Sequence, residues 1–206
     1  MNLNITGIRG KGKDATVMPP KTSGNPADDF QTEDYGIVPL LPYLRPGMRV
    51  WECAAGKGQM ARALQAQGLE VFATDIKGER PVDFLHSLCA GRPLRYDIAI
   101  TNPAYSVKDA FLRRCFEAGK PFALLLPLTA LGEQGRAAMF RQYGACDLIV
   151  PDRRIQFTTP SGKQGGSWFF TAWFTRGLVP GGVEESGMGR IVYHDPLDRR
   201  GLTPSS

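Results

Sequence analysis

The sequence lacks the features that mark secreted, membrane-spanning or disulfide-linked proteins. Four cysteines stand singly, without a CxxC pair: Cys53, Cys89, Cys115 and Cys146. This spacing predicts free buried thiols in a reducing compartment. No apolar run approaches the roughly 20 residues needed to span a bilayer, and the first residues lack the apolar segment of a secretory signal. We therefore expect a cytoplasmic protein that does not enter a membrane.

Histidine is also scarce, and neither His86 nor His194 has a partner at metal-ligand spacing. We expect both to be structural or surface residues, and we predict no metal site. The 206 residues, of which 42% are hydrophobic and 22% charged, suit one globular domain. The net charge of +5 is compatible with a polyanionic partner.

The two ends contain few large apolar residues. Residues 1–29 combine glycine and proline with lysine and arginine, which predicts a flexible basic N-terminal arm. Residues 179–206 are also rich in glycine and predict a C-terminal tail, in which the run 190–193 either docks as a strand or folds on a partner. The folded domain is expected to cover residues 30–178.

The middle of the chain alternates strand and helix patterns. Strands are predicted at 49–53, 69–74, 96–101, 121–127, 146–150 and 168–175, and helices at 57–67, from 106 onward and at 132–143. This alternation predicts an α/β fold, a mostly parallel sheet with helices on both faces. Such sheets bind ligands beyond the carboxyl ends of their strands. The chemistry is therefore expected just after Glu52, Thr74 and Thr101.

A glycine turn and three acids indicate a nucleoside cofactor. The turn 52–58 follows the first strand but has neither the GK[ST] ending of a Walker loop nor the third glycine of GxGxxG. Glu52 suits a ligand ammonium group, and Asp75 can accept hydrogen bonds from ribose hydroxyls. Asp83 can accept from an adenine amine while Phe84 packs on the ring. The alternative is that these acids are solvated loop carboxylates.

The segment Asn102-Pro103-Ala104-Tyr105 follows the predicted strand 96–101. Here the sequence resembles the N6-adenine DNA methyltransferases, in particular the small enzymes of phages and prophages, whose catalytic tetrapeptide is (D/N)PP(Y/F). The resemblance covers about 28–176 and implies a Rossmann-like class I methyltransferase fold with S-adenosyl-L-methionine as cofactor. The implied cofactor contacts are Phe30, Thr32, Glu52, Ala54, Gly56, Gly58, Asp75, Ile76, Asp83 and Phe84.

The same resemblance implies catalytic roles for Asn102, Pro103 and Tyr105. An exocyclic amine is a poor nucleophile because its lone pair is delocalised into the ring. The Asn102 side-chain oxygen and the Pro103 carbonyl can accept its two N–H bonds and draw the nitrogen toward tetrahedral geometry, while Tyr105 stacks on the base. Ala104 replaces the second proline of the family, which loosens the loop without removing an acceptor. The alternative is an ordinary Asn-Pro turn.

The expected substrate is adenine in DNA, either flipped out of a duplex or in a single strand. Predicted substrate contacts are Arg153, Arg154 and Lys163, the last of these in the polar stretch 158–167; the alternative there is a plain hairpin loop. A target-recognition domain of about a hundred residues has no room in this chain. Short or relaxed sequence specificity is therefore expected.

Other functions share parts of this pattern. Protein-glutamine methyltransferases carry the same Asn-Pro-x-Tyr element, and RNA adenine is chemically close to DNA adenine. A catalytically silent protein that keeps the fold to bind cofactor or DNA, as in the blocking of restriction, is a third alternative. Glutamine methyltransferases usually carry an N-terminal helical domain, which residues 1–29 are not expected to form, and the presence of Asn102, Tyr105 and Asp75 argues against a silent protein. The adenine methyltransferase is therefore the first expectation among these.

Overall fold

The computed structural model describes residues 31–32, 34–77, 82–87, 95–132, 134–158, 164–166 and 169–195. Several predicted features lie outside these residues: the basic arm 1–29, Phe30, Cys89, Lys163 and the last part of the tail, 196–206.

The main sheet of the described chain has seven strands in the order β10-β6-β9-β5-β4-β2-β3. They are β2 (Arg49–Glu52), β3 (Glu70–Ala73), β4 (Ile98–Thr101), β5 (Phe122–Pro127), β6 (Asp147–Val150), β9 (Thr171–Arg176) and β10 (Ile191–Tyr193). All neighbouring pairs are parallel except the two made by β9. The first of these strands, β2, lies between β3 and β4, so the order of winding reverses beside it. The predicted mostly parallel, Rossmann-like sheet is thus confirmed.

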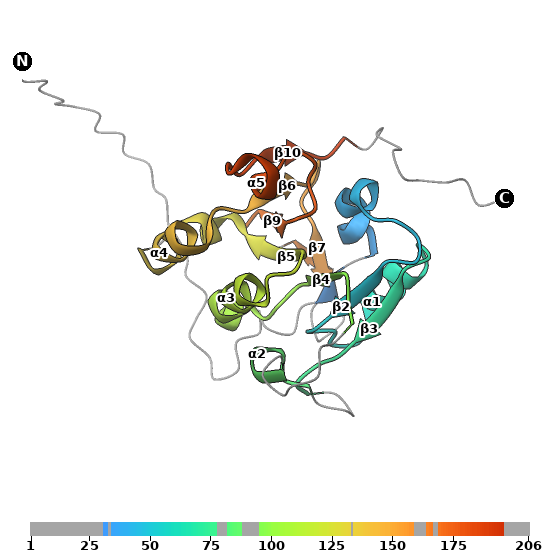
Figure 1. Cartoon of the computed structure of the whole chain (residues 1–206). Helices are drawn as coiled ribbons and strands as arrows, with labels where there is room; N and C mark the ends of the chain where they lie inside the picture. The colour runs from blue at the N-terminus through green and yellow to red at the C-terminus, as the bar shows by residue number, and fades with distance from the viewer. Residues whose placement is uncertain are drawn as a thin grey trace, which may run out of the picture.

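Helical segments cover both faces of the sheet (Figure 1). One face carries α2 (Phe84–Ser87), α3 (Lys108–Ala118) and α4 (Gln134–Tyr143), and the other carries the 3-10 helix η2 (Asp34–Tyr43) and α1 (Gln59–Gln65). The buried strand β5 alternates between the two cores: Phe122, Leu124 and Leu126 pack on the α3 side, whereas Ala123 and Leu125 pack on the α1 side.

The segment after residue 178, predicted as a tail, belongs in part to the fold. It forms α5 (Val183–Ser186) and then β10, which pairs with β6. The buried carboxylate of Asp147 on β6 accepts the backbone N–H groups of Val183 at 3.0 Å and Arg190 at 2.9 Å. Because a buried carboxylate needs such donors, this contact fastens the segment to the sheet. The folded part therefore reaches at least Asp195, beyond the predicted boundary.

A small second sheet also differs from the prediction. It consists of β1 (Gln31–Thr32), β7 (Gln156–Thr158) and β8 (Gln164–Gly166), which pair antiparallel in the order β1-β7-β8. The start of η2 is tied to it and to the main sheet: the Tyr35 hydroxyl accepts the N–H of Gln156 at 2.6 Å, and the Trp173 indole donates to the Gly36 carbonyl at 2.9 Å. These ties bring the upstream residue Thr32 to the carboxyl edge of the main sheet. None of the helices in the described residues has the length and apolar character needed to cross a membrane.

Candidate active site

The carboxyl end of β2 presents a buried acid. Glu52 is 1% exposed, and its Oε1 accepts the N–H of Ala54 at 3.1 Å and a very short bond from the Thr101 hydroxyl. Burial raises the pKa of Glu52 to about 7, opposed by these two hydrogen bonds, with a smaller upward contribution from Asp75. Glu52 forms no ion pair with another described residue. A buried carboxylate without a cation is suited to a ligand ammonium group.

The glycine turn after β2 is tied to the end of β3 through Asp75. Its Oδ2 accepts the N–H of Gly56 and its Oδ1 the N–H of Lys77, both at 2.8 Å. Gly56 and Gly58 have φ values of 51° and 75°, a region that favours glycine. An ionised carboxylate offers about four acceptor sites, so Asp75 keeps capacity for two hydroxyl donors while it shapes the turn.

Asp83 and Phe84, the next predicted cofactor contacts, have different surroundings. Asp83 precedes α2 and accepts the N–H of Leu85 at 2.9 Å. Phe84 is 2% exposed, stacked on Phe111 at 4.9 Å and edge-on to Trp51 at 5.1 Å. Phe84 therefore packs in the core of the α3 side, and its contact with a ligand ring stays a prediction. The other predicted cofactor contact in this region, Ile76, is 61% exposed.

The loop after β4 carries the predicted catalytic residues. The amide nitrogen of Asn102 donates to the hydroxyl of Thr32 at 3.0 Å. The other end of that amide, Oδ1, is buried and accepts no hydrogen bond from the described residues. Thr32, predicted as a cofactor contact, is 4% exposed and accepts the Asn102 amide in this ligand-free structure.

Tyr105 supplies a second unpaired polar atom in the same loop. Its hydroxyl oxygen is buried without a partner in the part of the chain that the structure describes, and burial raises the pKa of Tyr105 far above its usual range. Its ring meets Phe169 edge-on, with the centroids 5.4 Å apart. Ala104, which lies between Asn102 and Tyr105 in sequence, has φ −51° and ψ 126°, values that a proline also adopts. A proline would fit this backbone conformation at position 104.

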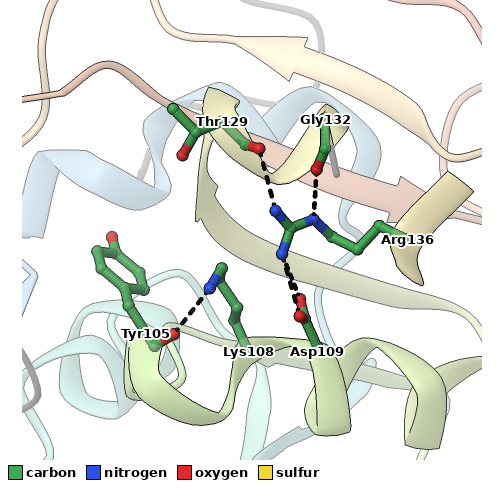
Figure 2. Close-up of polar contacts among 6 residues, drawn as sticks. All are labelled: Tyr105, Lys108, Asp109, Thr129, Gly132 and Arg136. Atoms are coloured by element: carbon green, nitrogen blue, oxygen red, sulfur yellow. Dashed lines mark hydrogen bonds and ion pairs between the residues drawn. The ribbon is translucent and has the colours of Figure 1, made fainter. Parts of the chain in front are cut away.

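A buried arginine joins α3, which follows this loop, to the segment after β5 (Figure 2). Arg136 on α4 donates to the carbonyls of Gly132 at 2.9 Å and Thr129 at 3.3 Å, and its Nη1 lies 2.8 Å from a carboxylate oxygen of Asp109 on α3. The short 3-10 helix η3 (Tyr105–Val107) leads into α3, whose N-cap residue Val107 makes no side-chain cap. Asp109 in the first turn of α3 joins this helix to α4 through Arg136.

The predicted substrate arginines lie beyond β6, at the same edge. Arg153 and Arg154 are both exposed. Arg153 pairs with Asp152 at 3.2 Å, and the Arg154 guanidinium lies 4.5 Å from the centre of the Phe170 ring.

Three residues of this edge were missed by sequence reasoning: Thr101, Phe169 and Arg136. Thr101 was identifiable in principle, because it ends β4 directly before Asn102 and β4 is the neighbour of β2. Phe169 and Arg136 contact Tyr105 and Asp109 across long stretches of chain, and no periodic pattern reports such pairs. Among the described residues, no cluster of histidine, cysteine or acidic side chains is placed to hold a metal ion.

Comparisons with known proteins report similarity of fold at low identity. No family model and no curated protein matches the chain. Solved structures that match include a phosphoethanolamine N-methyltransferase 2 of Haemonchus contortus bound to S-adenosylhomocysteine (15% identity, TM-score 0.36, 53% of this chain and 32% of that one). A second is a precorrin-6y C5,15-methyltransferase of Geobacter metallireducens (12% identity, TM-score 0.41, 72% of this chain and 92% of that one). A third is a release-factor-specific protein-(glutamine-N5) methyltransferase of Alicyclobacillus acidocaldarius (17% identity, TM-score 0.38, 69% of this chain and 88% of that one). This chain matches about a third of the length of the Haemonchus enzyme.

Proposed function

We propose that the protein transfers a methyl group from S-adenosyl-L-methionine to the N6 amine of adenine in DNA. One observation carries the proposal. The Asn102 Oδ1 and the Tyr105 hydroxyl, three residues apart in one loop, are buried and have no partner in the described residues. Each such atom costs about 1–3 kcal/mol. A ligand that brings N–H donors to Asn102 recovers that cost, and an exocyclic amine carries two.

The residues before this loop fit the cofactor. The buried Glu52 carboxylate has no cation among its described contacts and suits the ammonium of the methionine end. Asp75 shapes the glycine turn and keeps acceptor sites for the two ribose hydroxyls. Glu52 ends β2, Asp75 follows the parallel neighbour β3, and Asn102 follows β4 on the other side of β2. Cofactor and catalytic loop thus share the place where the winding reverses.

The reaction needs an acceptor for each amine hydrogen. Asn102 Oδ1 and the Pro103 carbonyl would accept hydrogen bonds from these two N–H groups, which pulls the nitrogen toward tetrahedral geometry and makes its lone pair available. The bound cofactor would supply an electrophilic methyl group for in-line transfer: the S–CH3 bond would break as the N–CH3 bond forms, S-adenosylhomocysteine would be the leaving group, and the methylated amine would release one proton to solvent. Since the pKa of Tyr105 is raised by burial, its hydroxyl stays protonated and the loop adds no anion. The rate gain comes from positioned dipoles.

A methyl-transfer assay with labelled cofactor tests the proposal on DNA, RNA and a release-factor protein. We expect label in DNA as N6-methyladenine, identified by mass spectrometry of the digest. Asn102→Ala should lower turnover about 100-fold, the effect of losing one preorganised transition-state partner, while cofactor affinity measured by calorimetry changes little. Label found only in RNA, or only in a glutamine side chain, would show that DNA adenine is not the substrate. Cofactor binding without transfer to any of the three would favour a silent binding protein.

A further inference from the structure

Exposed apolar side chains form a row beside the catalytic loop. Val107 follows β4, Leu131 follows β5, and Phe170 precedes the antiparallel strand β9; their exposures are 39%, 49% and 59%. Sheet order places β4, β5, β9 and β6 side by side, so these residues lie in sequence along one edge. The exposed Arg153 and Arg154 follow β6 and continue that row.

Phe170 is the best anchored member of the row. Its carbonyl accepts the N–H of Leu128 at 2.9 Å, which fixes its backbone to the end of β5. The preceding Phe169 contacts the Tyr105 ring, whereas the Phe170 ring lies under the Arg154 guanidinium. Two consecutive aromatic residues therefore connect the catalytic tyrosine to an exposed cation.

We propose that Phe170 is the stacking platform for the nucleotide next to the target adenine, with Arg154 at the adjoining phosphate. The inference rests on the proposed function and extends it to the polymer around the reacting base. Base stacking on an aromatic ring tolerates any sequence, and a guanidinium binds both phosphate and aromatic faces. Residues 152–154 carry one acid and two arginines, so the turn keeps a positive charge despite the pairing of Asp152 with Arg153.

A platform of this kind selects a chain of nucleotides over an isolated nucleoside. The target base enters between Asn102 and the cofactor, and its neighbour lies on Phe170. The platform reads no base edge, and it therefore contributes affinity without sequence preference. A stacking role would explain why the Phe170 ring is exposed and does not pack in the core.

Phe170→Ala tests the platform, with Phe170→Trp as the conservative variant and Phe72→Ala as the matched control. Phe72 is 49% exposed and lies on β3, the far edge strand of the main sheet. Binding is measured by fluorescence anisotropy with a labelled single-stranded DNA oligonucleotide that contains adenine. Phe170→Ala should weaken binding about tenfold, with the loss appearing in KM for the oligonucleotide more than in kcat. Phe170→Trp should retain affinity, and Phe72→Ala should match the unaltered protein.

Two outcomes overturn the inference, and they differ from each other. If the unaltered protein methylates the oligonucleotide and Phe170→Ala binds it equally well, the platform is wrong and the proposed function stands. If the unaltered protein neither binds nor methylates the oligonucleotide, the nucleic-acid substrate and the platform both fail. Thermal unfolding of each variant checks that it is folded, which an exposed position such as Phe170 should permit.

Discussion

The hydroxyl of Thr32 accepts a hydrogen bond from the side-chain amide of Asn102, 70 positions later in the chain, at 3.0 Å. Thr32 itself is enclosed: a Cβ atom added to Gly36 would lie 2.5 Å from its methyl group. The contact leaves the amide oxygen of Asn102 as the unpaired end. The short upstream strand β1 thus sets the orientation of the residue on which the proposed reaction depends.

Removal of this acceptor should slow the chemical step. Thr32→Val keeps the shape of the side chain but cannot accept from Asn102, so the amide is free to rotate. We expect kcat for methyl transfer to fall about tenfold or more, within the range for loss of one positioned dipole. Thr32→Ser keeps the hydroxyl and should retain most of the activity. Equal losses in both variants would show that Thr32 acts only through packing.

The affinity for the cofactor should depend on pH through Glu52. Its carboxyl has a pKa of about 7 in the ligand-free protein, whereas a ligand ammonium pairs with the ionised form. Affinity for S-adenosyl-L-methionine should therefore rise about tenfold between pH 6 and 7.5, as the binding-competent fraction increases. Calorimetry across this range checks it. Glu52→Gln, which keeps acceptors for Ala54 and Thr101, should bind weakly and show no such rise.

The stability of the ligand-free protein should change in the opposite sense. The folded pKa of Glu52 lies above its ordinary value of 4.5. This group therefore contributes stability below pH 4.5 that is lost as pH rises through 7. The loss is on the order of 3 kcal/mol. Urea unfolding of the unaltered protein and of Glu52→Gln between pH 5 and 8 measures this contribution. The glutamine side chain does not titrate, so the difference in the free energy of unfolding between the two proteins reports the Glu52 carboxyl group.

Asp75→Ala should weaken the cofactor complex by about 1–3 kcal/mol, the cost of unpaired polar groups. The loss has two sources, because Asp75 accepts N–H groups of the glycine turn as well as the expected ribose hydroxyls. Asp75→Asn keeps one acceptor oxygen, for either the N–H groups of the turn or the ribose hydroxyls, and should lower cofactor affinity less than Asp75→Ala. Unchanged affinity of the alanine variant in calorimetry would refute the ribose role.

Ala104→Pro should keep or raise activity. The observed φ of −51° and ψ of 126° are those of a proline, so the substitution introduces no strain at its own φ. A compatible proline stabilises by about 0.4–1 kcal/mol through the unfolded chain. Thermal unfolding and the methyl-transfer rate measure the two effects. A loss of activity would mean that the loop needs the freedom that alanine allows.

Local patterns account for the sheet and for where its chemistry lies. The strand runs that end at Glu52 and Thr101 are apolar and flanked by helix signals, and the rule for carboxyl ends then places the glycine turn and Asn102 together. Contacts between segments far apart in the chain leave no local pattern in the sequence, so they could not be predicted from it. The burial of Phe84 depends on Trp51 and Phe111, which approach it from a strand and a helix. The pairing of β10 with β6 is accompanied by such a contact, because the Asp147 carboxylate accepts N–H groups of Val183 and Arg190, 36 and 43 positions away.

Arg136 offers a test of how the surroundings of the loop are held (Figure 2). It is 5% exposed and spans three segments: its own helix α4, the carbonyls of Thr129 and Gly132, and Asp109 on α3. Arg136→Met keeps most of the buried stem but removes the donors, and we expect a loss of about 2 kcal/mol in the free energy of unfolding.

The matched control for Arg136→Met is Asp109→Asn. The Asp109 side chain is 48% exposed, so this change removes a charge that water still reaches, and the carbonyl bonds of Arg136 remain. It should cost less than about 1 kcal/mol. Equal unfolding energies for the two variants would place the main support in the ion pair rather than in the carbonyl bonds.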